Sequence, residues 1–173
     1  YGADNYPINC TVLDDCEDEG LYTASATGST LASDKKMYKS IGIEMASETL
    51  NETFIRDLGA SNTVDLSGHD LLKFWIYSEV DNTSGFDFGI GKSAYTEITV
   101  NTGTLTAKCW KEVELDLSGI SDTNKDAIRY IGFKNNSSGS ITAVFDFIRA
   151  FDGEEYIDSP NISLYKVPKE YVY

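Results

Sequence analysis

Aromatic and charged side chains occupy every second position in one run near the middle of the chain, residues 71–78. Successive residues of a strand point to opposite faces, so Lys73, Trp75 and Tyr77 share one face and oppose an apolar set. A lysine on that face indicates that it is not dry core. Indole and phenol rings stack on the apolar C–H faces of pyranose rings, and charged groups bond the sugar hydroxyls. The run therefore predicts a sugar-binding surface.

The same alternation selects partners for this run in other strand-like segments. In 85–91 it sets Asp87 opposite three apolar residues, and in 128–134 it sets Tyr130 and Lys134 opposite two. In 143–149 it puts Val144, Asp146 and Ile148 on one face and Phe145, Phe147 and Arg149 on the other. One arrangement that satisfies these patterns puts the whole ligand-binding set on one sheet: Trp75, Tyr77, Asp87, Tyr130, Lys134 and Arg149.

Alternation says which side chains share a face, but not which face meets solvent. In the alternative interpretation, Trp75 packs beneath a loop or the C-terminal tail and belongs to the core. In the sugar-binding interpretation, Trp75 and Tyr77 stack on the rings of the ligand. Asp87, Tyr130 and Arg149 then supply polar contacts.

These side chains need a scaffold of short strands. Strand-like runs occur about ten times, and they are separated by turn clusters such as 81–85 and 135–139. This pattern predicts an all-β fold, a two-sheet antiparallel jelly-roll β-sandwich. One helical turn is expected at 121–127. The runs are 11–16, 21–27, 38–46, 53–58, 71–78, 85–91, 95–101, 109–117, 128–134 and 141–150.

Length and composition favour a single domain. At 173 residues with 41% hydrophobic residues, the chain can form one full core. We expect residues 1–10 to be a lead-in and 11–151 the sandwich. Residues 152–173 are expected to be a tyrosine-rich tail that packs on the sandwich or leads to a neighbouring domain of a longer chain.

Charge and cysteine content exclude some classes of partner. The net charge of −14 argues against nucleic acid, because a phosphate backbone would be repelled. No apolar run is long enough to insert into a membrane. The three cysteines (Cys10, Cys16 and Cys109) have no metal-type spacing, and they allow at most one disulfide.

Several segments, taken in order, resemble the jelly-roll carbohydrate-binding modules, the galactose-binding-like sandwiches attached to polysaccharide hydrolases and found in bacteriophage tail proteins. The resemblance covers about residues 11–151, and it departs from the family pattern at 38–40, where a glycine is often expected. The matching segments are 13–18, 34–43, the Asp-Leu-Ser-Gly turn at 65–68 with the strand after it, Trp110 with 113–117, and 128–133 with 145–148.

The resemblance implies a structural calcium ion. Members of the family often hold one between the first strand, the loop before the third strand and the final strand; the matching positions are Glu17, Asp34 with the backbone to Lys39, and Asp146. Calcium takes hard oxygen ligands of this kind. Asp146 stands between two phenylalanines, where a bare charge is costly unless a cation or backbone N–H groups compensate it.

The resemblance further implies a non-catalytic module that binds a polysaccharide or cell-surface glycan, in an extracellular or virion-surface setting. His69 is the only histidine, and no nucleophile motif accompanies it, so the sequence predicts no enzyme. Two alternatives remain open. One is a structural or receptor-attachment domain of a phage tail or virion without its own sugar ligand. The other is a polysaccharide lyase or hydrolase on the same fold, using a pair of its 28 acidic residues.

Overall fold

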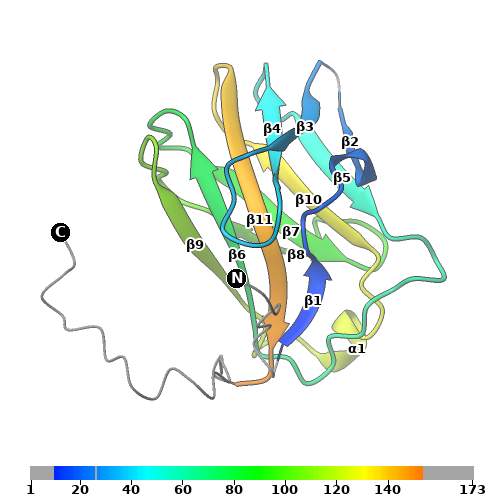
Figure 1. The fold of residues 1–173 in the computed structure, drawn as a ribbon. Helices are drawn as coiled ribbons and strands as arrows, with labels where there is room; N and C mark the ends of the chain where they lie inside the picture. Colours follow the sequence, from blue (N-terminus) through cyan, green and yellow to red (C-terminus); the bar gives the residue numbers. More distant parts are fainter. Residues whose placement is uncertain (1–9, 26, 154–173) are drawn as a thin grey trace, which may run out of the picture.

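A computed structural model describes residues 10–25 and 27–153 and shows a sandwich of two antiparallel sheets (Figure 1). The six-stranded sheet has the spatial order β3 (Ser29–Ser33), β4 (Gly42–Ser47), β11 (Ile141–Phe151), β6 (Leu71–Ser78) and β9 (Trp110–Asp116), and β1 (Cys10–Asp14) pairs with the end of β11. The five-stranded sheet has the order β2 (Tyr22–Ala24), β5 (Thr53–Asp57), β10 (Tyr130–Asn135), β7 (Phe86–Gly91) and β8 (Ile98–Asn101). The predicted jelly-roll sandwich is confirmed.

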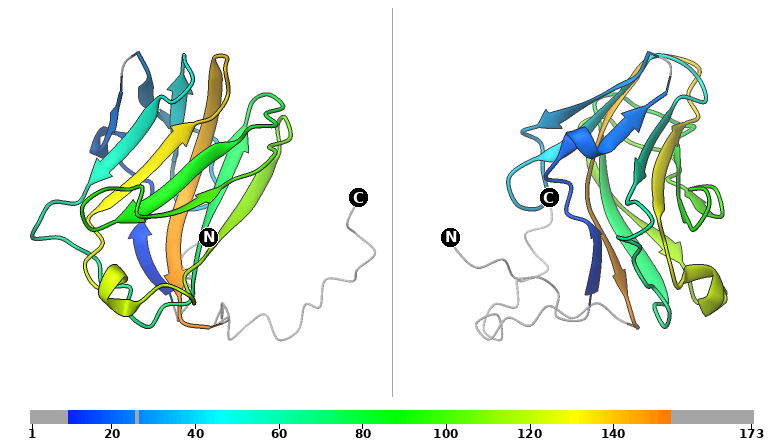
Figure 2. Two further views of the ribbon diagram at one scale, coloured as in Figure 1. Left: turned by 180° about the vertical axis from the view of Figure 1, so that it is seen from behind. Right: turned by 90° about the vertical axis from the view of Figure 1, so that its right-hand side faces the viewer.

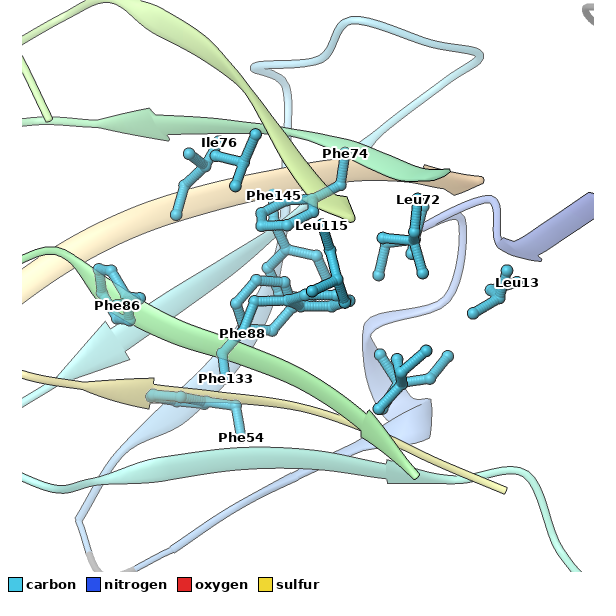
Figure 3. Close-up of a cluster of buried hydrophobic side chains, with 14 of the residues drawn as sticks. Leu13, Phe54, Leu72, Phe74, Ile76, Phe86, Phe88, Leu115, Phe133 and Phe145 are labelled. Atoms are coloured by element: carbon cyan, nitrogen blue, oxygen red, sulfur yellow. The ribbon is translucent and has the colours of Figure 1, made fainter. Parts of the chain in front are cut away.

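The core lies between the two sheets and is rich in phenylalanine (Figure 3). The Phe74 and Phe88 rings, one from each sheet, have centroids 4.4 Å apart, and the Phe133 and Phe145 rings are 4.3 Å apart. Ring pairs of this kind add about 0.5–1.5 kcal/mol to the gain from burial. These rings fill the inner positions of both sheets. Along each strand, the residues that alternate with them therefore point outward.

Two short helices complete the described chain, η1 (Glu19–Leu21) and α1 (Asp122–Lys125), the latter at one end of the sandwich (Figure 2). The single helical turn expected near 121–127 is confirmed. The buried Lys125 explains its position, since Nζ donates to the carbonyls of His69 at 2.7 Å and Leu117 at 3.3 Å. It thereby ties together the two Asp-Leu-Ser-Gly turns. None of the helices in 10–25 and 27–153 could span a membrane.

The strand predicted at 38–46 is wrong in its first half. Residues 34–41 form a loop, and strand β4 begins only at Gly42. Lys39 has a φ of 49°, which breaks an extended run, and the amides of the loop bond to carboxylates instead of a neighbouring strand. Strand β3 was not predicted, because its polar sequence Ser-Thr-Leu-Ala-Ser is that of an exposed edge.

Strand β11 contains a bulge that changes which of its side chains face outward. Its register against β6 shifts between Asp146 and Arg149, and Phe147 has a φ of 51°. Phe145 and Ile148 therefore both enter the core. The prediction that they lie on opposite faces is wrong, because strict alternation does not survive the extra residue.

A buried charged cluster joins the sheets near β1. Asp14, whose side chain is 1% exposed, accepts from Arg56 at 2.6 Å, from the Tyr22 hydroxyl at 2.6 Å and from the Cys16 amide at 2.8 Å. Burial, and then the charge of Asp14, raises the pKa of Tyr22 and keeps its hydroxyl protonated as a donor. Cys16 and Cys109 are free thiols.

Removing the cation from this cluster tests its role in stability. Arg56→Met leaves the Asp14 carboxylate buried without its counter-charge, so we expect a loss of about 3–5 kcal/mol in the free energy of unfolding. Arg129→Met breaks an exposed pair with Asp57 and is the matched control, with a much smaller expected loss because solvent screens the pair. Urea denaturation measures both. Equal losses in the two variants would contradict the assigned role of Asp14.

Candidate functional site

The structure divides the six predicted ligand-binding residues between the two outer faces of the sandwich. Strands β7 and β10 belong to the five-stranded sheet, whereas β6 and β11 belong to the six-stranded sheet. The predicted arrangement on one sheet is therefore not found, because alternation does not fix which strands pair. Asp87, Tyr130 and Lys134 lie outward on the five-stranded sheet, and Trp75, Tyr77 and Arg149 lie outward on the six-stranded sheet.

We call the first group, with its neighbours, the five-strand face: Asp57, Asp87, Tyr95, Asn101, Arg129, Tyr130 and Lys134. Near its middle, Lys134 and Asp87 are cross-strand partners with a 2.9 Å ion pair. Asp87 also accepts from the Asn101 amide at 2.8 Å. Partial burial raises the pKa of Asp87, but the bonds from Lys134 and Asn101 outweigh it, so the pKa lies below its ordinary value. Asp87 is therefore a fixed, ionised acceptor.

Tyr95 belongs to this face and was missed from the sequence. It lies in the loop between β7 and β8, which folds back over the sheet. A Cβ added at Gly132 would be 2.6 Å from Cγ of Tyr95, and one at Gly89 would be 2.1 Å from the Tyr95 carbonyl oxygen. Only glycine allows this close approach. The sequence contains a signal for this contact: glycines occupy the outward positions 89, 91 and 132, and glycine inside a strand marks a site where another part of the backbone approaches closely.

The loop that carries Tyr95 is held by one carboxylate. Glu97 accepts from the amides of Lys92 at 2.8 Å and Ser93 at 2.9 Å. These backbone bonds hold the pKa of Glu97 below its usual value, so it stays ionised and keeps the loop closed. The Tyr95 ring is thus pre-positioned above β10.

Tyr130 supplies the second ring of the five-strand face. The Arg129 guanidinium lies 4.9 Å from the centroid of this ring. Arg129 also makes a two-pronged pair with Asp57, with both N–O distances at 2.7 Å. These bonds lower the pKa of Asp57 to about 2. The face thus combines two half-exposed phenol rings with two ion pairs whose charges cancel.

The second group lies on what we call the six-strand face: Lys73, Trp75, Tyr77, Trp110, Glu112 and Arg149. Trp75 is half-buried and points away from the core, so the interpretation of it as a core residue is not supported. Tyr77 is the direct cross-strand partner of Trp110, and their ring centroids are 5.5 Å apart. The Lys35 ammonium lies 5.5 Å from the centroid of the Tyr77 ring.

Arg149 has a positioning role on this face. Its side chain is 4% exposed, donates to Glu112 at 2.6 Å and lies over the Phe147 ring at 4.8 Å. Lys73 approaches the other oxygen of Glu112 at 3.8 Å and pairs with Glu114 at 2.9 Å. Arg149 is thus not presented to solvent as a polar contact. Its contribution is to hold the Glu112 carboxylate in place.

The predicted metal ligands Glu17 and Asp146 both bind the loop at 34–41, which passes in front of β11 (Figure 1). Asp146 Oδ2 accepts from the amides of Met37 at 2.6 Å and Tyr38 at 2.7 Å. Glu17 Oε1 accepts from the amides of Ser40 at 2.9 Å and Ile41 at 3.3 Å. Backbone N–H groups therefore compensate part of both charges.

The second carboxylate oxygen of Asp146 makes no hydrogen bond. This atom, Oδ1, is buried. Burial, with a smaller contribution from the negative charge of Glu17, raises the pKa of Asp146 to about 6. No three Asp, Glu, His or Cys side chains within 10–25 and 27–153 come together as metal ligands, and Asp34 is exposed. A buried carboxylate oxygen without a partner, near a second carboxylate, is a hard ligand of the kind that Ca²⁺ takes.

Solved structures that share this sandwich include carbohydrate-binding modules. A family 11 module from Clostridium thermocellum, in complex with a β-1,3-1,4-mixed-linked tetrasaccharide, matches 86% of this chain and 98% of its own, with a TM-score of 0.64 and 20% identity. The chain shares their fold. A family 30 module of a C. thermocellum cellulosomal cellulase matches 73% and 83%, with a TM-score of 0.54 and 17% identity. A family 22 xylan-binding domain from Paenibacillus barcinonensis matches 82% and 97%, with a TM-score of 0.52 and 12% identity.

No family model and no curated protein matches the sequence. The similarity to the solved structures confirms the expected resemblance to carbohydrate-binding modules at the level of the fold. The segments that suggested it, from 13–18 to 145–148, lie in β1, β4, β6, β9, β10 and β11 and in the loops beside them. The tail predicted at 152–173 lies, from 154 onward, outside the described residues.

The fit of Tyr95 against Gly132 can be tested by filling the space with one methyl group. Gly132→Ala drives a Cβ into Tyr95, so we expect displacement of the loop at 92–97 and a loss of about 1–3 kcal/mol in unfolding free energy. Gly119→Ala is the matched control, because a Cβ there meets nothing within 4 Å. Its expected effect is within about 0.5 kcal/mol. Chemical denaturation gives both values, and an unperturbed Gly132→Ala protein would refute the close contact.

Proposed function

We propose that this chain is a non-catalytic module that binds polysaccharide on its five-strand face. One observation carries the proposal: two half-exposed phenol rings, Tyr95 and Tyr130, are fixed beside two neutralised ion pairs on the same face. Rings supply the flat apolar surface that sugar C–H groups require. Carboxylate, ammonium and guanidinium groups supply the donors and acceptors for hydroxyls.

Pre-organisation supports this choice of ligand. Tyr95 is held by the glycine positions beneath it and Tyr130 by the strand, so binding costs little further side-chain entropy. Asp87 and Lys134 neutralise one another, as do Asp57 and Arg129. A face with no local excess of charge suits a neutral sugar polymer better than a strongly charged one.

The protonation states on this face favour binding over catalysis. Glycoside hydrolysis by the usual route needs one carboxylic acid with a raised pKa and a second carboxylate. Here the pKa of Asp57 is about 2, and that of Asp87 is lowered by its bonds to Lys134 and Asn101. Neither carboxyl can hold a proton near neutral pH. We therefore propose a targeting role, outside the cell, within a longer polysaccharide-acting protein.

We also propose that Glu17, Asp146 and backbone oxygens of the loop at 34–41 hold a structural calcium ion. The bound cation would supply the missing partner of Asp146 Oδ1 and offset the repulsion between the two carboxylates. In that role it would fix the loop against β11. The proposal concerns stability, and the five-strand face lies on the opposite sheet.

The proposed binding face can be tested with the variants Tyr95→Ala and Tyr130→Ala. Each variant removes a stacking ring. We expect the affinity for polysaccharide to fall about tenfold or more, and a tenfold loss corresponds to about 1.4 kcal/mol. The measurement is retention in native gels that contain mixed-linked β-1,3-1,4-glucan, xylan or other neutral polysaccharides. Leu31→Ala is the matched control, since it removes an exposed side chain from β3 of the other sheet.

Two results would contradict the proposal. It fails if the wild-type protein binds none of the polysaccharides. It also fails if both tyrosine variants bind as tightly as the wild type. Loss of binding in Leu31→Ala would show that the six-stranded sheet carries the site instead.

Calcium and protons should compete at Asp146. With calcium removed, the pKa of about 6 in the folded protein exceeds the ordinary 3.8, so the stability from this carboxyl is present at acidic pH and lost as pH rises through 6. Calcium binds the ionised form. Calcium at ~100 times its Kd is therefore expected to raise the melting midpoint by about 5–10 °C near neutral pH, and by much less near pH 4.

The variant Asp146→Asn provides the comparison. It has no charge to titrate, so we expect both the calcium effect and this part of the pH dependence to disappear. Asp116→Asn, at an exposed position of β9, is the control and should respond as the wild type does. Identical midpoints of the wild type in calcium and in chelator at neutral pH would refute the calcium site.

A further inference from the structure

We propose that the six-strand face is a second polysaccharide-binding surface, formed by Trp75, Tyr77 and Trp110. This inference rests on the proposed function in one respect, because it assumes the same class of ligand. The second surface has a different location, since strands β6 and β9 lie in the opposite sheet from β7 and β10. A chain with both surfaces can hold two polysaccharide strands at once.

The first argument is the arrangement of the rings. Tyr77 and Trp110 are direct cross-strand partners, and Trp75 precedes Tyr77 by two residues on the same side of β6. Trp75 is therefore the diagonal neighbour of Trp110, a relation that separates Cα atoms by about 7–8 Å. Trp75, Tyr77 and Trp110 thus lie next to one another on the same side of the sheet. Both indoles are half-buried, so each presents part of its surface to solvent.

The second argument is the polar group fixed beside the rings. Glu112 is the direct cross-strand partner of Trp75, and its side chain is 27% exposed. Arg149 donates to one of its oxygens at 2.6 Å, and Lys73 lies 3.8 Å from the other. A carboxylate held on both sides cannot rotate away, yet it keeps lone pairs free for further donors. It is a ready acceptor for sugar hydroxyls next to the Trp75 ring.

A third argument favours a sugar polymer over a protein partner. The centres of protein interfaces are depleted of charged residues. Here ionised side chains adjoin two of the three rings: Glu112 lies opposite Trp75, and Lys35, paired with Glu79 at 2.5 Å, lies over Tyr77. The outward positions of β9 beyond Trp110 are all acidic: Glu112, Glu114 and Asp116. Rings set among hydrogen-bonding groups match a polyhydroxylated ligand with apolar ring faces.

The two surfaces are expected to differ in strength. Tyr77 is only 9% exposed and has the Lys35 ammonium over its ring, so contact on the six-strand face depends on the two half-buried indoles. We expect its affinity to be lower than that of the five-strand face. For a polymer the weak second site still matters, because binding at one face raises the effective concentration at the other. The expected result is bridging between polysaccharide strands.

The chain provides its own reporter for this test. Trp75 and Trp110 are its only two tryptophans, and both lie on the six-strand face, whereas the five-strand face has tyrosines alone. Fluorescence excited at wavelengths that tyrosine does not absorb therefore reports on one face. The probes are soluble mixed-linked β-1,3-1,4-glucan and xylan. We expect saturable quenching and a blue shift in the wild type.

The decisive protein is the Tyr95→Ala/Tyr130→Ala double variant. It has lost the proposed primary site, and we expect its tryptophan emission to keep responding to polymer. Adding Trp75→Ala to this background is expected to weaken the response of Trp110 at least fivefold. Leu31→Ala added instead is the control and should leave the titration unchanged.

Each remaining outcome has a distinct meaning. If the wild type is retained in polysaccharide gels but its emission does not change, the second surface is refuted and the proposed function stands. If the emission change disappears in the double tyrosine variant, it was a secondary effect of binding at the five-strand face, and the second surface is again refuted. If the change survives but the tyrosine variants bind as the wild type does, the second surface stands and the primary site is wrong. If no polymer is retained and none changes the emission, both proposals fail.

Discussion

The sealed core between the two sheets is the constraint on which the rest of the molecule depends. Rings from both sheets, such as Phe74 with Phe88 at 4.4 Å, lock the inner positions of every central strand. Each strand then has only its alternate residues left for contact with anything else. These residues form two outer faces that point in opposite directions. Any binding surface built on strands must use one face or the other, and the aromatic and charged residues of this chain are divided between both.

Loops that pack on the two sheets modify these faces. Asp146 follows the inward-facing Phe145 and points outward by regular alternation, where it accepts from the amides of Met37 and Tyr38. On the other sheet, Gly89 and Gly132 leave space into which the loop with Tyr95 folds. The candidate calcium site and the candidate binding ring thus both lie where a loop packs against the outer side of a strand.

The sequence predicted the sandwich, most of its strands and the single helical turn, because apolar alternation and turn residues are local signals. Alternation grouped Trp75 with Tyr77 and Tyr130 with Lys134 on shared faces, and the lysine and aromatic residues on those faces suggested that they meet solvent. The prediction that the whole set lies on one sheet is wrong, because strand order depends on contacts between distant segments, which alternation does not record. The bulge at 146–149 also escaped, since nothing in Phe-Asp-Phe-Ile-Arg marks an extra residue. Tyr95 and Trp110 were missed because a loop residue and the first residue of a strand carry no alternation pattern.

We propose that the outward-facing side chains of the strands recognise carbohydrate, with the bound polymer lying across Tyr95 and Tyr130. Backbone amide NMR of the whole chain, titrated with mixed-linked β-1,3-1,4-gluco-oligosaccharides and xylo-oligosaccharides, tests this most directly. The account predicts that at least one of these ligands shifts signals concentrated in β10, β7 and the loop at 92–97 first, and on β6 and β9 at higher concentration. Spectra that both ligands leave unchanged, or shifts confined to residues away from both faces, would contradict it.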